Sequence, residues 1–256
     1  DPELLERSED LFGPGSVIYG SDALGGVMHF YTIDPALSST DQVETKTVLS
    51  TRYGSVNNEK HLHAHIEIGG KKWASLSSMS ISDFGDLRAG RNRSRAFENV
   101  GIRDSFVQRI DQQDQIVANL DPNIQRFSGY GQLDMMQKFI FEPNSRNKHS
   151  LNIQLSTSTD IPRFDRLTQL SSGRLRFAEW HYGPQERFMA AYSLHHSAKT
   201  FLWDEWKLSA AYQRIEESRH SRVFQSNWIN HRRERLHIGS VNMDFHKKLG
   251  VKGRLT

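Results

Sequence analysis

The clearest indication of the fold is the stretch Lys60-His61-Leu62-His63-Ala64-His65-Ile66-Glu67-Ile68-Gly69. Its apolar side chains occupy the even positions 62–68, and its imidazoles and carboxylate occupy the odd positions 61–67. Successive side chains of a β-strand point to opposite faces of the sheet. This period of two therefore predicts a strand with one apolar and one polar face.

The same alternation recurs along most of the chain. Further strands are expected, with cleaner or looser alternation, at residues 43–53, 72–82, 131–141, 150–158, 187–195, 205–213 and 235–246. In the last range the apolar phase changes between Ile238 and Val241, which predicts a β-bulge near Gly239. Another strand is expected to begin near Val251. The pattern thus predicts an all-β, antiparallel chain of about eight or nine strands.

The lengths of the expected connections favour one of two architectures. After the first connection, short and long connections alternate, and the long ones are 83–128, 159–186 and 217–233. Transmembrane β-barrels have short turns at one end and long loops at the other, whereas a sandwich has no reason to sort its loops. We therefore expect an antiparallel transmembrane β-barrel. The alternative is a soluble antiparallel β-sandwich, a binding or structural protein whose apolar faces form a core.

Composition excludes several classes of function. The charge balance, 33 Lys and Arg against 30 Asp and Glu, is too even to indicate a nucleic-acid-binding protein. No apolar run approaches the roughly 20 residues of a membrane helix. The absence of cysteine removes disulfides, thiolate metal sites and thiol nucleophiles. No Ser/His/Asp spacing rises above chance, so we predict no enzyme, no catalytic residue and no cofactor.

The histidines of the first stretch do not predict a metal site. His61, His63 and His65 share one strand face, and neighbours on one face are about 6.6–6.8 Å apart. A single metal ion needs ligands near 2 Å, so it could take at most one or two of them. We interpret them as polar side chains that face the interior of the barrel.

The first 34 residues have a different character, because the string from Leu11 to Pro35 is rich in glycine. No Gly-Lys-Ser/Thr follows, which excludes a phosphate-binding loop, and the spacing of Gly13, Gly15 and Gly20 does not fit a dinucleotide-binding motif. A short apolar strand is expected at residues 27–31.

This glycine-rich string resembles the end of the plug domain of TonB-dependent outer-membrane receptors, Gly-Pro-x-Ser-x-x-Tyr-Gly-x-x-Ala-x-Gly-Gly-Val. The matching positions are Gly13, Pro14, Ser16, Tyr19, Gly20, Ala23, Gly25, Gly26 and Val27. Residues 4–9 stand where the family has a strand, with a different sequence. Residues 83–88, 160–167 and 182–187 look like loop segments of a Bacteroidetes-like branch.

The resemblance implies that residues 1–36 are the C-terminal end of a plug domain. Residues 41–256 would be the N-terminal part of a barrel that has about 22 strands in the family. The chain begins at Asp1 without Met, and we expect it to be an internal piece of a longer protein.

The resemblance also implies a function. The family resides in the outer membrane of Gram-negative bacteria and takes up haem, ferric siderophores or cobalamin with energy from the TonB complex. TonB would contact plug residues upstream of this chain, and the other partners would be the ligand and outer-membrane lipid. Gly25, Gly26, Val27, Phe30, Thr32 and Asp34 are similar to the plug exit of haem receptors, which favours haem. No ligand-contact residue is predicted.

Overall fold

The computed structural model describes residues 2–13, 23–249 and 253–255. The chain is all-β, as predicted, and the helices among these described residues are limited to η1 (Pro2–Leu4), η2 (Arg95–Phe97) and α2 (Phe164–Leu167). Within the described ranges, no helix has the length and apolar character required to cross a membrane.

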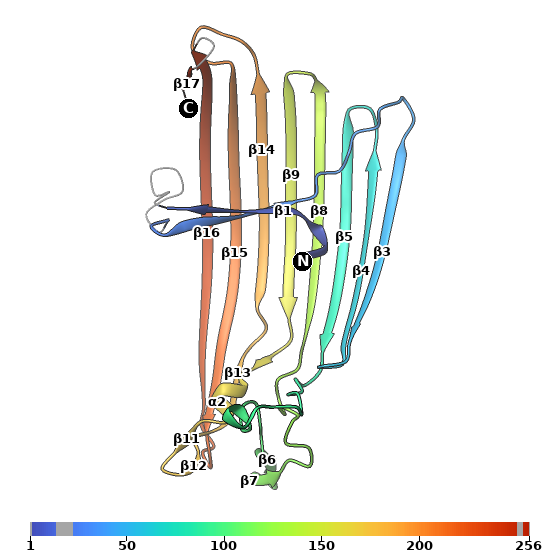
Figure 1. Cartoon of the computed structure of the whole chain (residues 1–256). Coiled ribbons are helices and arrows are strands. Elements are labelled where there is room, and N and C mark those ends of the chain that lie inside the picture. The colour runs from blue at the N-terminus through green and yellow to red at the C-terminus, as the bar shows by residue number, and fades with distance from the viewer. Residues whose placement is uncertain (1, 14–22, 250–252, 256) are drawn as a thin grey trace.

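Eight long antiparallel strands form most of one large sheet (Figure 1). They are β3 (Glu44–Gly54), β4 (Glu59–Gly69), β5 (Trp73–Phe84), β8 (Tyr130–Asn144), β9 (Asn147–Ser158), β14 (Glu186–Ser197), β15 (Glu205–Val223) and β16 (Ile229–Leu249), with the short β17 (Gly253–Leu255) paired to β16. Every strand expected from the alternation is present. Among the described residues the sheet is open, with β3 at one edge and β16 and β17 towards the other, and they form no closed barrel.

Two expectations for the last hairpin are wrong. Residues 217–233 are not a long loop, because β15 continues to Val223 and β16 begins at Ile229. There is no bulge at Gly239, which lies opposite Tyr212 in an unbroken ladder. The backbone ladder needs only its own N–H and C=O groups, so it continues where the side chains lose their apolar alternation.

The long connections carry small elements of their own, which gather at one end of the sheet (Figure 1). Residues 85–129 contain the hairpin β6 (Ser105–Ile110) and β7 (Gln113–Ala118). Residues 159–185 contain β10 (Ile161–Pro162), the hairpin β11 (Leu170–Ser171) and β12 (Arg174–Leu175), and β13 (Phe177–Tyr182), which extends the sheet by pairing with β15. Short turns join the strands at the opposite end. We call these two ends the loop end and the turn end.

A separate two-stranded pair, β1 (Leu5–Phe12) and β2 (Gly26–Thr32), lies across one face of the sheet (Figure 1). β2 confirms the strand expected at residues 27–31. Leu4 packs against Leu76 and Met136 of the sheet, with Ile33 beside them, and these side chains form a small buried core. The pair therefore rests on the sheet through apolar contacts, and the sheet has one covered and one uncovered face.

Part of the glycine motif lies at one end of this pair. Of its members, Gly13, Ala23, Gly25, Gly26 and Val27 are described, and Pro14, Ser16, Tyr19 and Gly20 lie outside the described residues. The Gly13 N–H donates to the Gly25 carbonyl at 3.3 Å. A Cβ atom at Gly26 would lie 2.6 Å from the backbone oxygen of Leu11, so close pairing of β1 and β2 requires glycine there.

Candidate functional site: two faces of the sheet and its loop end

The uncovered face is apolar and exposed. Many of its large side chains keep more than a third of their surface accessible, as at Ile66 (37%), Leu151 (39%) and Val241 (72%). In the described part of the chain, no second sheet of comparable size packs on this face.

Charge is missing from a broad zone of this face. Because side chains alternate, its positions can be read from the strand register. They include no Asp, Glu, Lys or Arg within the described residues 45–53, 62–68, 73–81, 133–141, 149–157, 188–194, 206–212 and 237–245. We call this zone the uncharged band.

Polar atoms within the uncharged band pair with one another. Gln137 accepts a hydrogen bond from Ser77 at 2.5 Å and donates one to Ser75 at 2.8 Å. A ring nitrogen of His149 lies 2.7 Å from the Tyr192 hydroxyl. The Tyr212 hydroxyl is similarly 2.8 Å from His237. Such lateral pairing supplies the partners that polar groups need where water is absent.

Several aromatic side chains lie near the ends of the long strands. Trp73 begins β5 at the turn end and stacks on Phe139, with ring centroids 6.4 Å apart. Trp203 and Trp206 lie at the same end, next to the start of β15. Tyr53 closes β3 near the loop end, but Tyr212 lies inside the long β15.

Away from the small core around Leu4, the covered face is largely polar. His61, His63 and His65 are buried there. The rings of His61 and His63 lie 2.8 and 2.6 Å from the hydroxyls of Ser82 and Ser80, and His63 also lies 2.9 Å from His65. No group of three or more His, Asp or Glu side chains in the described ranges is arranged to hold a metal ion.

Lys138 fixes the segment that leaves β2 to the covered face. Its side chain is only 8% exposed, and Nζ donates to the Thr32 carbonyl and hydroxyl at 3.0 Å and to the Ile33 carbonyl at 3.1 Å. Nζ also pairs with Asp34 at 2.5 Å, and Lys148 reaches the same carboxylate at 3.3 Å. Burial would raise the pKa of Asp34, but the hydrogen bond and charge of Lys138, with the charge of Lys148, lower it overall.

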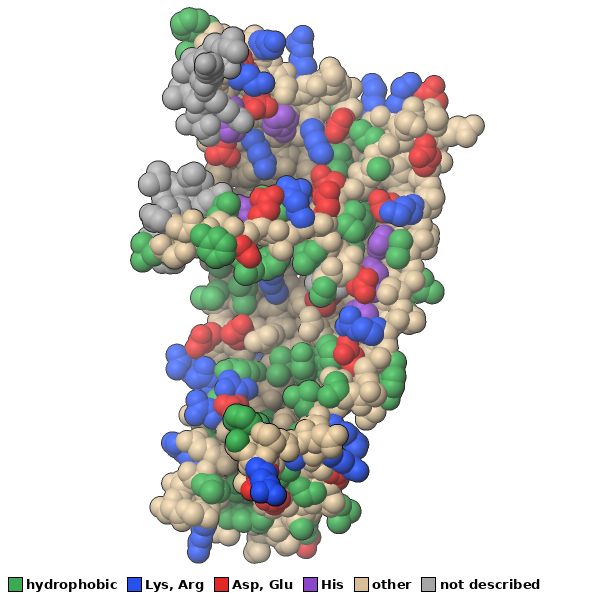
Figure 2. Space-filling model, in the orientation of Figure 1, with side chains coloured by type: hydrophobic (Ala, Val, Ile, Leu, Met, Phe, Trp, Pro, Cys, Tyr) green, Lys and Arg blue, Asp and Glu red, His purple; other side chains and the backbone are tan. Residues whose placement is uncertain are grey.

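A polar pocket of about 560 Å³ opens beside this contact. Lys138, Lys148, Lys207 and His195 line it together with Asp34 and several serine and asparagine side chains. Figure 2 displays charged side chains on this face, above the β1–β2 pair as the molecule is drawn. The excess of lysine over carboxylate suits the pocket to an anionic group.

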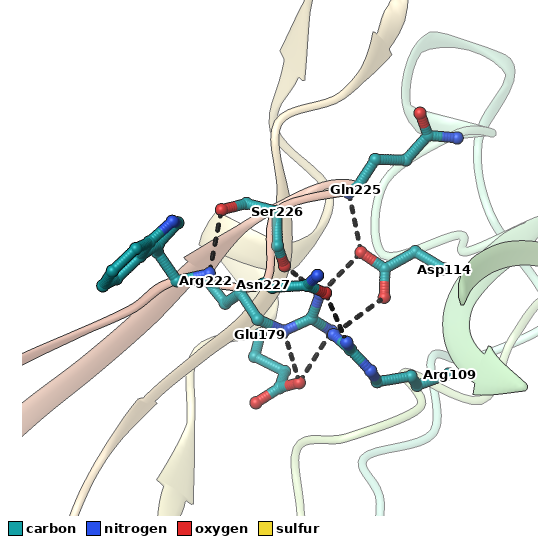
Figure 3. A network of polar contacts seen from close by, with 8 residues as sticks. Arg109, Asp114, Glu179, Arg222, Gln225, Ser226 and Asn227 are labelled. Atoms are coloured by element: carbon teal, nitrogen blue, oxygen red, sulfur yellow. Dashed lines mark hydrogen bonds and ion pairs between the residues drawn. The ribbon is translucent and has the colours of Figure 1, made fainter. Parts of the chain in front are cut away.

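At the loop end, a buried ion pair joins segments that are distant in sequence (Figure 3). Arg222 of β15 donates to Asp114 of β7 at 2.6 Å, and the two side chains are 2% and 1% exposed. Arg222 also donates to Glu179 of β13 at 2.7 Å and to the Ser226 carbonyl at 2.9 Å. The Gln225 N–H donates to Asp114 at 2.7 Å. The network therefore ties the β6–β7 hairpin, β13 and the β15–β16 turn together.

The electrostatics of this network favour the ionised carboxylate. Burial alone would raise the pKa of Asp114. The hydrogen bonds from Arg222 and Gln225 and the charges of Arg222 and Arg109 outweigh burial and lower that pKa. The nearby Arg109 also donates to Asn227 at 2.6 Å, which adds a second link across the same junction.

None of these polar residues was predicted as functional from the sequence. Lys138 and Asp34 are 104 positions apart and Asp114 and Arg222 are 108 apart, so no local spacing joins them. The one local signal is Lys138 itself, a charge on the polar side of an alternating strand.

A scan against protein-family models found none that matches this chain. A search of curated proteins found no match either.

Proposed function

We propose that this chain is part of a TonB-dependent outer-membrane receptor that imports an iron-containing nutrient, haem or a ferric siderophore, or cobalamin. The observation that carries the proposal is the uncharged band on eight long antiparallel strands, exposed on one face while the other face is polar and covered. The described members of the glycine motif belong to the β1–β2 pair, which covers the polar face, or lie next to it.

The uncharged band suits contact with lipid. Its backbone groups are paired in the ladder, and several of its polar side chains are paired laterally, so these groups would keep their partners in hydrocarbon. A β-sandwich would instead need another sheet to cover the band, and the described residues supply none.

In this proposal residues 1–36 are the end of the plug and residues 41–256 are the first part of the barrel. Further strands of the full receptor would pair with the two edges of the sheet, which otherwise present unpaired backbone groups. Lys138 would hold the plug exit to the barrel wall, TonB would pull on plug residues upstream, and transport would involve no bond chemistry.

The first experiment tests the membrane assignment in the full-length protein. Ile153 lies in the uncharged band and the adjacent Gln154 lies on the covered face. A lysine at the bilayer midplane costs a barrel about 2–4 kcal/mol, whereas an interior position tolerates charge. We expect Ile153→Lys to reduce the folded, heat-modifiable receptor in outer-membrane fractions, and Gln154→Lys to leave it unchanged. Equal tolerance of both substitutions would contradict the assignment.

The second experiment tests the cargo. A strain that lacks the gene is grown with haem, a ferric siderophore or cobalamin as the sole source of iron or of the vitamin. We expect a defect on one of the three, favouring haem, and the same defect when TonB is removed. Normal growth on all three would refute the proposed cargo class.

A further inference from the structure

A row of histidines crosses three neighbouring strands at the loop end. His181 of β13 lies directly opposite His220 of β15, and His220 lies directly opposite His231 of β16. Directly opposed residues of antiparallel strands point to the same face and are close enough to touch. On β15 and β16 the uncharged band ends at Tyr212 and His237, so the row lies beyond it, on the segments that close the loop end.

The three imidazole rings are in contact with one another. Those of His181 and His220 are stacked, with centroids 4.8 Å apart and planes 12° apart. Those of His220 and His231 have centroids 4.7 Å apart, and their Nδ1 atoms are separated by 2.5 Å. The other ring nitrogen of His220, Nε2, lies 2.9 Å from the Ser218 hydroxyl.

This geometry limits the number of protons that the row can hold. Two Nδ1 atoms at 2.5 Å can share one proton, because one nitrogen donates and the other accepts. If both rings are protonated, both nitrogens become donors and the hydrogen bond is lost. Two cations then stand side by side, and the stacked ring of His181 adds a third when it is protonated.

The surroundings of the row also resist protonation. Among the described residues, the charged groups that lie around it are Asp160 before β10, Glu179 of β13, Arg222 of β15 with its partner Asp114 of β7, and Arg233 of β16. Burial lowers the pKa of His220, and the charges of His181, His231 and Arg233 lower it further, against the opposing effect of Asp160. Asp160 itself lies 3.6 Å from Nε2 of His181.

We propose that the histidine row is a pH-sensitive switch, which holds β13 to β15 and β16 at neutral pH and releases β13 when more than one of its imidazoles is protonated. β13 carries Glu179, one of the ionic partners of Arg222, so its release would open the loop end. The inference concerns the loop end alone and does not depend on the proposed function.

The direction of the pH effect follows from proton linkage. In the open form His220 would titrate near the ordinary histidine pKa of about 6.5, whereas the closed form holds that pKa lower. Opening therefore takes up a proton and becomes more favourable as pH falls below about 6.5. Between about pH 7.5 and about pH 5.5, one such histidine raises the open population by up to about tenfold. The pKa of Asp114 is lowered, so its carboxylate remains charged in this range.

The test is hydrogen exchange of the amides of residues 177–182 in the full-length protein at these two pH values. Rates are expressed as protection factors, which remove the intrinsic effect of pH on exchange. We expect protection of β13 to fall by up to about tenfold at the lower pH, while protection of β9 stays constant. In His220→Gln, which cannot take up the proton, protection of β13 should no longer depend on pH. His195→Gln is the matched control, because it removes an imidazole on the covered face of β14 that lies 3.3 Å from Glu205, and it should keep the full response.

Three results would overturn the inference: protection of β13 that does not change with pH in the unmodified protein, the same pH response in His220→Gln, or an equal loss of response in His195→Gln. If His220→Gln leaves β13 open at both pH values, His231→Asn decides the question. It removes the ring at 2.5 Å from His220 and keeps the Ser218 contact, so the pH response should shrink. An unchanged response in His231→Asn would contradict the proposed switch.

Discussion

The buried pair of Arg222 and Asp114 gives the sharpest prediction, because it holds the loop end together. The substitution Asp114→Asn keeps the size of the side chain and an acceptor for the Gln225 N–H, but removes the charge that compensates Arg222. Arg222 remains 2% exposed, and its one remaining ionic partner among the described residues is then Glu179, which is 41% exposed.

The magnitude follows from this geometry. Removing one member of a buried ion pair costs about 3–5 kcal/mol. Because Glu179 still compensates part of the Arg222 charge, we expect about 2–3 kcal/mol for local opening of the loop end. That free energy corresponds to an increase of about 30- to 150-fold in the open population.

The assay is hydrogen exchange of the amides in β6 and β7 in the full-length protein. Asp111→Asn is the control, because Asp111 is exposed in the hairpin turn, and asparagine tolerates its positive φ of 47°. We expect faster exchange in residues 105–118 for Asp114→Asn and no change for Asp111→Asn. Unchanged exchange in both variants would refute the reasoning that this pair closes the loop end.

Three further outcomes follow from the covered face and the β1–β2 pair. Lys138→Met should increase protease cleavage of residues 33–43 by about tenfold or more, since it removes several charge-assisted hydrogen bonds, whereas Lys148→Met removes one partly exposed contact and should have a small effect. Gly26→Ala should destabilise the β1–β2 pair by about 1–3 kcal/mol through overpacking, whereas Gly25→Ala should not, because its added Cβ meets nothing within 4 Å. Circular dichroism melts of the full-length protein, with protease mapping of residues 5–12, would distinguish the two variants. Because the pKa of Asp34 is lowered in the folded state, its carboxylate should stabilise this contact fully above the ordinary pKa of about 3.9. That stabilisation should be lost only as pH falls through the lower folded pKa. Release of residues 33–43 at a higher pH, in an acid titration followed by proteolysis, would contradict this.

The sequence alone predicted the eight long strands of the large sheet, because alternation is a local property, but it did not predict β10 and β13. In residues 60–69 apolar and polar side chains alternate at every position, so the face of each one can be predicted from its neighbours, and the structure has β4 at Glu59–Gly69. The short strand at residues 27–31 could be predicted in the same way, from its local sequence. What alternation could not reveal is where a strand continues without it, and so residues 217–233 were expected to be a loop. A change in the phase of the apolar alternation is also ambiguous, because it can mark either a β-bulge or apolar residues on both faces. Here Leu236 and Ile238 lie on the opposite face from Val241, and the ladder has no bulge.

The candidate sites depend on contacts that only the tertiary structure decides. Lys138 meets Asp34, and Arg222 meets Asp114, because the β1–β2 pair crosses the sheet and the long connections fold back over its loop end. Residues that are a hundred positions apart carry no mutual signal in one sequence. By contrast, Glu216 pairs with Arg214 on its own strand and with Arg233 and Arg235 on the adjacent strand. These contacts follow from the local alternation and from the register between β15 and β16. The sequence thus determined which side chains can share a face, and the tertiary structure determined which face is covered and which charges meet, because burial depends on the packing of distant segments.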